Sequence, residues 1–294
     1  MSEFKYTGEE VTVELVFNVA RLLEANGIPC ILINDCMHDI FGFDVAVTDI
    51  EFVIPDDLMD KAVDVLRAAD FADDPIVPQG ELKCRPFRAL CERARGRDIT
   101  RFEPIHWFHL AGEDAPDEFH PELCLHQKSD YFWNLPDLVL GPVNENDPHF
   151  MLATDRRLPG MMYYGRLNVD IPPIKVPRPA RYVEAMMLLC ARDAHTRDRG
   201  AQWALEIQLL RDLYFDRGCL DELLRMECFY PQFQVWWENL CEDDTMPANE
   251  EGYVTALRWM EEGYLPDTLF PWLCEEEDPF PGYNSPRAVI TELA

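Results

Sequence analysis

Basic side chains are scarce in this sequence of 294 residues, where 26 Lys and Arg face 55 Asp and Glu and the formal net charge is −29. Non-specific binding to nucleic acid or to an anionic membrane requires a positive surface, so this charge argues against both. An apolar run of ~20 residues, the length of a membrane-spanning helix, is also missing. We therefore expect no membrane partner and no nucleic-acid partner.

Several sequence signatures of known chemistry are absent too. No Gly-x-Gly-x-x-Gly, Gly-Lys-Ser/Thr, Gly-x-Ser-x-Gly or His-Glu-x-x-His motif occurs, which argues against the enzyme classes that depend on them. The ten cysteines form no Cys-x-x-Cys pair, so structural zinc is not expected. The first ten residues are polar and acidic and do not resemble a secretory signal. We expect a cytoplasmic protein with reduced thiols.

Hydrophobic residues make up 48% of the chain, enough for one large or two modest domains. Strand and helix patterns alternate before residue 170, and helical patterns dominate after a proline-rich segment at 170–177. We predict an α/β domain over 1–170, a helical domain over 171–280 and a tail over 281–294. Long loops with short strands are expected at 111–148, and the later helices are expected at 200–216, 220–228, 231–241, 251–262 and 266–274.

The most informative stretch is a predicted strand at 30–33, a short helix at 35–41 ended by Gly42, and a second strand at 48–54. Asp49 and Glu51 are two residues apart, so their side chains share one face of this second strand. Two carboxylates on an apolar strand are costly to bury unless a cation lies between them, and hard oxygen ligands suit Mg²⁺. The alternative is that this face is solvated and the two acids bind nothing.

The segment GIPCILINDCMHDIFGFDVAVTDIEFVIPDD, residues 27–57, resembles the nucleotidyltransferase fold. Proteins of that superfamily have a strand, a turn of glycine and a small residue, a short helix, and a second strand with an Asp-x-Asp pair after a threonine. Helices predicted at 11–26 and 57–69 extend the resemblance over residues 10–71, and more loosely over 72–110. The resemblance implies an α+β fold, a nucleotidyltransferase-like mixed sheet with flanking helices, followed by an α-helical C-terminal domain.

The resemblance also implies site residues. Asp49 and Glu51 take the place of the catalytic, metal-binding pair, with Thr48 before them and Mg²⁺ as the cofactor. Asn34 and Asp35 take the place of the nucleotide-binding turn.

A third carboxylate is expected near the strand predicted at 104–110, which contains no acid. Glu103 has the same parity as Ile105, Trp107 and His109, so it is the candidate that reaches the metal face. His106 and His109 differ by an odd number and face opposite ways on a strand, so they cannot hold one metal jointly. With His120 and His126 nearby, a histidine metal site is a second option.

Two segments are locally basic. The first, at 83–101, contains Arg85 and Arg88, and the second spans 178–199. Such a segment either pairs with acids elsewhere in the protein or binds an anionic ligand such as a nucleotide phosphate.

Two functions follow from these residues. The first is Mg²⁺-dependent transfer of a nucleotidyl group from a nucleoside triphosphate to a small-molecule or protein acceptor. The alternative is a catalytically inactive module with this fold that holds a ligand or partner. The turn favours this alternative, because Asn34 and Asp35 replace the glycine and the small residue found there in the superfamily. Asp35 is predicted to cap the helix and to occupy the amides that a phosphate would need.

Overall fold

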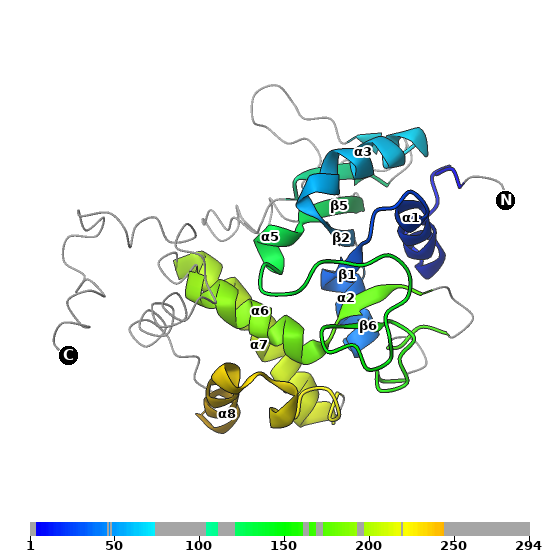
Figure 1. Ribbon diagram of the computed structural model, residues 1–294. Helices are drawn as coiled ribbons and strands as arrows, with labels where there is room; N and C mark the ends of the chain where they lie inside the picture. The colour runs from blue at the N-terminus through cyan, green and yellow to red at the C-terminus, as the bar shows by residue number, and fades with distance from the viewer. Residues whose placement is uncertain are drawn as a thin grey trace, which may run out of the picture.

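The computed structural model describes residues 4–45, 47, 49–73, 104–110, 121–160, 165–168, 173–192, 197–218 and 220–243. These residues form a mixed α+β structure with a central sheet and flanking helices (Figure 1). No helix in this part of the chain is both long and apolar enough to cross a membrane. Thr48, Arg85, Arg88 and Glu103 lie outside the described residues, as do the helices predicted at 251–262 and 266–274 and the tail.

The central sheet has five strands in the order β1-β2-β5-β4-β3. Strands β2 and β5 run parallel in its middle, and the other neighbouring pairs are antiparallel. The expected strand–helix–strand unit is confirmed, and so is a strand near 104–110. The strand bounds are β1 (Ile31–Ile33), β2 (Ile50–Ile54), β3 (Ala72–Asp73), β4 (His106–His109) and β5 (Glu122–Gln127).

Strand β5 lies between β2 and β4 and is buried from Glu122 to His126. The sequence predicts long loops with short strands in this region, and one of those short strands proves central to the sheet. Its apolar members, Leu123 and Leu125, alternate with Glu122, Cys124 and His126. Alternation with period two is the signal of a strand, and here it places polar groups on one buried face.

Helix α1 (Val13–Ala25) and helix α3 (Met59–Ala68) pack against each other and the sheet. The hydroxyl of Thr12 caps α1 by accepting a hydrogen bond from the amide of Leu15 at 3.2 Å. Both helices bury apolar residues at helical spacing, such as Leu15, Val19 and Leu22 in α1. A short 3₁₀ turn, η1 (Asp56–Leu58), connects β2 to α3.

Helix α2 (Asn34–Phe41) follows β1 without a loop, and Gly42 ends it with a φ of 104°. A positive φ of this size favours glycine, as the sequence indicates. The predicted cap is wrong, because Ile33 holds the N-cap position without a side-chain bond and Asp35 lies inside the first turn. Asn34 makes the sharp change of direction with a φ of 54°, which asparagine tolerates better than most residues.

The second half of the described chain contains a two-stranded sheet and several helices. Helix α6 is buried at every position from Pro179 to Cys190, so it is the central helix of this half. The remaining elements are α5 (Lys128–Tyr131), β6 (Phe150–Leu152), β7 (Lys175–Pro177), α6 (Pro179–Arg192), α7 (Arg197–Arg217), η2 (Met226–Cys228) and α8 (Pro231–Asp243).

The prediction of a helix over 220–228 is wrong. Leu220 has a φ of 65°, which a right-handed helix excludes, and only the 3₁₀ turn η2 forms near the end of this segment. Burial of Leu220, Leu223 and Leu224 accounts for the apolar spacing that indicated a helix. The helices expected at 200–216 and 231–241 are confirmed as α7 and α8 within a few residues.

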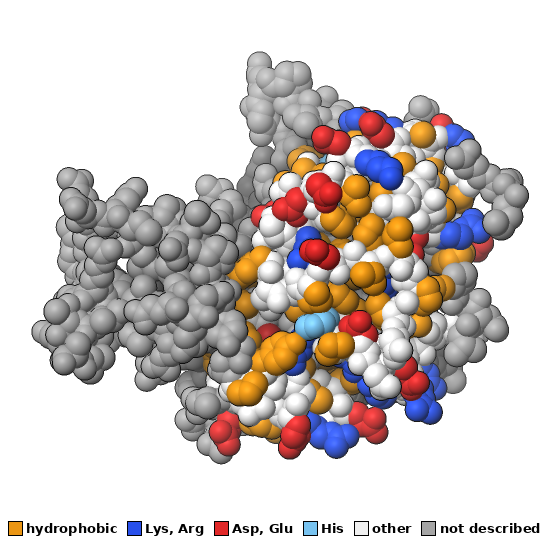
Figure 2. Space-filling view, in the orientation of Figure 1, with side chains coloured by type: hydrophobic (Ala, Val, Ile, Leu, Met, Phe, Trp, Pro, Cys, Tyr) orange, Lys and Arg blue, Asp and Glu red, His pale blue; other side chains and the backbone are white. Residues whose placement is uncertain are grey.

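The acidic surplus does not concentrate on the face shown in Figure 2. Among the described residues on this face, acidic side chains alternate with basic and apolar ones. The large negative charge is therefore not evidence for a single acidic docking patch here.

Candidate functional site

Two adjacent parallel strands bring polar side chains to one buried face of the sheet. Glu51 of β2 is in register with Cys124 of β5, and Val53 is in register with His126. Residues opposite each other share a face, so Glu51, Cys124 and His126 point to the same side. The prediction that His106 and His109 point to opposite faces is confirmed. They are in register with Leu125 and Glu122, which lie on opposite faces of β5.

Glu51 and His126 form a buried pair on this face. Glu51 Oε2 lies 2.7 Å from His126 Nε2, and each side chain is only 2% exposed. Burial of a carboxylate is tolerated when a hydrogen-bond donor replaces the lost water, and the Nε2–H of His126 supplies that donor. The edge-to-face contact of the imidazole with Tyr131, at 5.1 Å between ring centres, fixes the ring plane from the side of α5.

Asp49 holds the start of β2 against the start of β5. Its Oδ1 accepts a hydrogen bond from the backbone amide of Glu122 at 2.9 Å. The thiol of Cys36 in α2 donates to the backbone carbonyl of Asp49 at 3.4 Å. The two carboxylates that the sequence singled out thus both bond to groups on β5.

Glu122 is a third buried carboxylate that sequence reasoning missed. It is 6% exposed, begins β5, and has the same parity as Cys124 and His126. The third acid was expected at Glu103 instead, because the resemblance implies a carboxylate near the strand at 104–110 and Glu103 has the parity of its metal face. The alternation of apolar and polar residues from 122 to 127 is the signal that would have found it.

The environment of α2 is strongly negative. Burial raises the pKa of the Cys36 thiol, and the carboxylates of Asp35 and Glu51 raise it further, followed by those of Asp39 and Asp49. A thiol in such a field stays protonated and is a poor nucleophile. A phosphate placed at the start of this helix would meet the same field, because Asp35 occupies the first turn.

A second buried polar cluster joins α2 to the helical half. His38 Nε2 lies 2.9 Å from Glu206 Oε2, and the hydroxyl of Tyr182 donates to the same oxygen at 3.1 Å. Burial by itself lowers the pKa of His38, but the carboxylate of Glu206 outweighs burial and raises this pKa above its ordinary value of 6.5. The cluster ties α2 to α6 and α7.

The magnesium site expected at Asp49 and Glu51 stays a prediction. Three carboxylates supply the hard oxygen donors that Mg²⁺ prefers. However, His126 binds Glu51 Oε2, the amide of Glu122 binds Asp49 Oδ1, and no three His, Cys, Asp or Glu side chains among the described residues are placed to share a metal ion. The histidine metal site, the second option, also stays a prediction, and His120 lies outside the described residues.

In the second basic segment, 178–199, Arg178 and Arg181 bond to other groups of the protein. Arg178 donates to the backbone carbonyls of Glu145 and Asp147, and buried Arg181 pairs with Glu184 at 2.8 Å. Both arginines therefore support the fold, as the first of the two alternatives for this segment predicts.

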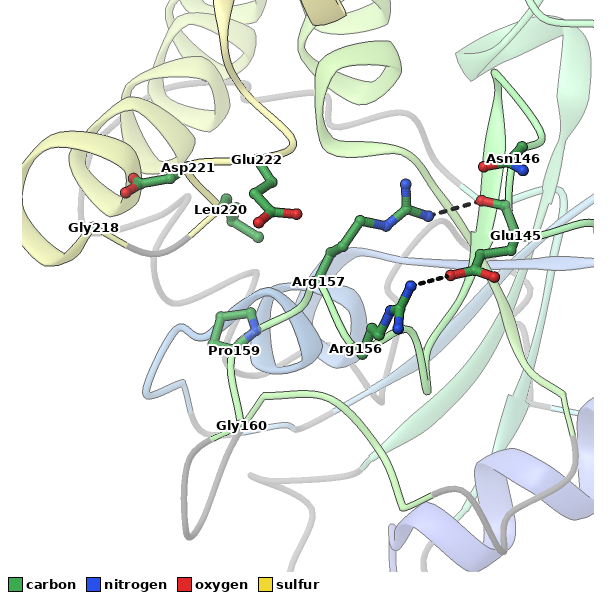
Figure 3. A pocket seen from close by; sticks show the side chains of 10 residues that line it. All are labelled: Glu145, Asn146, Arg156, Arg157, Pro159, Gly160, Gly218, Leu220, Asp221 and Glu222. Carbon is green, nitrogen blue, oxygen red and sulfur yellow. Dashed lines mark hydrogen bonds and ion pairs between the residues drawn. The ribbon is translucent and has the colours of Figure 1, made fainter.

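A cavity of about 790 Å³ lies between the segments on either side of β6 and the segment that follows α7 (Figure 3). Its lining comes from both sides of the domain boundary that the sequence predicts near residue 170. The lining residues are Glu145, Asn146, Arg156, Arg157, Pro159, Gly160, Gly218, Leu220, Asp221 and Glu222.

Comparisons of this chain with protein-family models, with curated proteins and with solved structures gave no match. The functional argument therefore rests on the geometry of the buried carboxylates and of the cavity.

Proposed function

We propose that this chain is a nucleotidyltransferase-like binding module, which holds a small ligand and does not transfer a nucleotidyl group with magnesium. The order β1, α2, β2, with α1 before and α3 after, agrees with the scaffold that the sequence resembles. Asn34, with its φ of 54°, occupies the turn where that scaffold uses glycine. The likeness thus includes a backbone feature as well as the order of elements.

One observation carries the proposal, namely the closed Glu51–His126 pair. The carboxylate in the place of a metal ligand is 2% exposed and lies 2.7 Å from an imidazole nitrogen. A metal that bound Glu51 Oε2 would have to displace His126, which would leave the imidazole in the interior without its acceptor. Displacing His126 in this way costs free energy. Two solvent-facing aspartates without such a partner would bind a metal without this cost.

Two further features support the same conclusion. Asp35 lies in the first turn of α2, where its charge opposes a triphosphate. The cavity of about 790 Å³ has the size of a small-molecule site, and it gives the module a place to hold a ligand away from the β2 carboxylates.

The test is calorimetric titration of ATP, GTP, CTP and UTP into the full chain, with and without Mg²⁺. We expect no binding that depends on magnesium, in the wild type or in Asp49→Ala. Tight magnesium-dependent binding of any nucleotide that is lost in Asp49→Ala but kept in Asp60→Asn would overturn the proposal. Asp60 is an exposed acid of α3 and serves as the control for a general loss of negative charge.

Magnesium-dependent nucleotidyl transfer to a small-molecule or protein acceptor is the second candidate. It is favoured by Glu122, which adds a third carboxylate to the strand beside Asp49 and Glu51. If the titrations detect magnesium-dependent binding, this candidate further requires that Glu122→Gln abolish it. Binding that survives Glu122→Gln would exclude a three-carboxylate site.

A further inference from the structure

The cavity between the segments that flank β6 and the segment after α7 has walls of opposite charge. Arg156 and Arg157, which follow β6, line one side, and Asp221 and Glu222 line the side formed by the segment after α7. In Figure 3 the carboxylate of Glu222 is turned toward Arg157, whereas Asp221 is turned toward Gly218. A ligand in this space would meet cationic groups on one side and a carboxylate on the other.

In the described part of the chain, Arg157 is held by several hydrogen bonds, and the side chain of the more exposed Arg156 by one. Asp155 binds Arg157 through both of its carboxylate oxygens, at 2.9 Å from Nε and 2.6 Å from Nη2. The same Nη2 donates to the backbone carbonyl of Glu145 at 2.9 Å, and Arg156 Nη2 donates to Glu145 Oε1 at 3.1 Å. Among the described residues these bonds leave Nη1 of both arginines to donate to a ligand. Each remaining Nη1 group can donate a charge-assisted hydrogen bond to a ligand carboxylate.

The anionic wall follows a turn in which two described residues have a left-handed backbone. Gly218 and Leu220, directly after α7, have φ values of 58° and 65°. Leu220 is 3% exposed and anchors this turn in the core, while Glu222 is exposed. The turn therefore presents the carboxylate of Glu222 from a fixed backbone.

We propose that this cavity binds a small zwitterionic ligand of the amino-acid class, with its carboxylate facing Arg156 and Arg157 and its ammonium group facing Glu222. This inference rests on the proposed binding function and names the ligand class. A polyanion such as a nucleoside triphosphate fits the cavity poorly, because its lining contains three carboxylates against two guanidinium groups. A zwitterion satisfies both walls, and the volume of about 790 Å³ accommodates an amino acid or a dipeptide.

The experiment is ligand-observed NMR and calorimetry of the full chain with the free L-amino acids at millimolar concentration. Each amino acid that binds is compared with its deaminated carboxylic acid and its decarboxylated amine. We expect binding of at least one amino acid, and weaker binding of both analogues. Glu222→Gln and Arg156→Gln should each weaken the amino acid about tenfold, because each removes one charge-assisted hydrogen bond.

The variants are chosen so that folding is preserved. The side chain of Arg156 is 83% exposed, and Glu222 is exposed. Glu227→Gln makes the same chemical change at an exposed acid outside the cavity and should leave affinity unchanged. Thermal denaturation of each variant verifies the fold.

Three outcomes overturn the inference: no amino acid binds, a singly charged analogue binds as tightly as its amino acid, or Glu222→Gln has no more effect than Glu227→Gln. Each of these leaves the proposed binding function untouched, since that proposal fails only through magnesium-dependent nucleotide binding. The two failures are therefore distinguishable on the same protein preparation.

Discussion

The carboxylate of Glu51 and the imidazole of His126 lie 2.7 Å apart in the protein interior, although 75 positions separate the two residues in the sequence. They meet because β2 and β5 are parallel neighbours in the middle of the sheet. A pair of this kind stabilises the fold only as long as both partners are present, because each one alone would be a buried polar group without compensation.

The stability of this pair can be measured with a double-mutant cycle. We expect Glu51→Leu and His126→Leu each to lower the free energy of unfolding by about 3 kcal/mol, because each leaves the other group buried alone. The double variant should be more stable than either single variant, since two apolar side chains of similar size replace the pair. Urea denaturation followed by circular dichroism provides the free energies.

The same cycle has a clear contrary outcome. If the double variant loses as much stability as the two single variants combined, Glu51 and His126 act independently and the pair does not close the site. Asp60→Asn, a charge removal on the exposed face of α3, should change stability by less than about 0.5 kcal/mol.

The turn between β1 and α2 makes a second prediction. Asn34 has a φ of 54°, a left-handed conformation that costs most side chains about 1 kcal/mol. We expect Asn34→Ala to lower the free energy of unfolding by about that amount and Asn34→Gly to change it by only a few tenths. Equal losses in the two variants would mean that the asparagine side chain, and not the backbone conformation, stabilises the turn. Chemical denaturation of both variants under one set of conditions decides between these.

The His38–Glu206 pair predicts a pH dependence of stability. In the folded protein, burial lowers the pKa of His38, but the carboxylate of Glu206 outweighs burial and raises this pKa above the ordinary value of 6.5. The folded state therefore holds a proton that the unfolded state has released between these two pKa values. The resulting stabilisation is complete below pH 6.5 and is lost as the pH rises through the folded pKa.

Glu206→Gln removes the charge that raises this pKa. We expect the free energy of unfolding of the wild type to fall more steeply with rising pH above 6.5 than that of the variant. Denaturation at a series of pH values gives both profiles, and direct titration of His38 by NMR gives its pKa in each protein. Parallel profiles, or an unchanged His38 pKa in the variant, would contradict this role for Glu206.

Local patterns accounted for much of the fold. The alternation in 48–54, the helical spacing in α1 and the glycine at 42 depend on neighbours a few residues away, and the structure confirms the elements they predict. The prediction for 220–228 was wrong because leucines with helical spacing also suit a turn that buries them individually. Asp35 was assigned the wrong role at α2, since the helix starts one residue earlier than its capping preference indicates.

The sequence by itself placed Asp49 and Glu51 at the start of a strand, because the apolar pattern of this strand is local; the strand begins at Ile50, directly after Asp49. It also determined the acidic charge and the strand–helix–strand order. Only the tertiary structure decided which groups meet these carboxylates. The pairing of β2 with β5 brings His126 to Glu51 and the amide of Glu122 to Asp49, and the turn after α7 places Glu222 across from Arg157. Strand register and helix packing are set by the burial of the whole core, so no local pattern contains them.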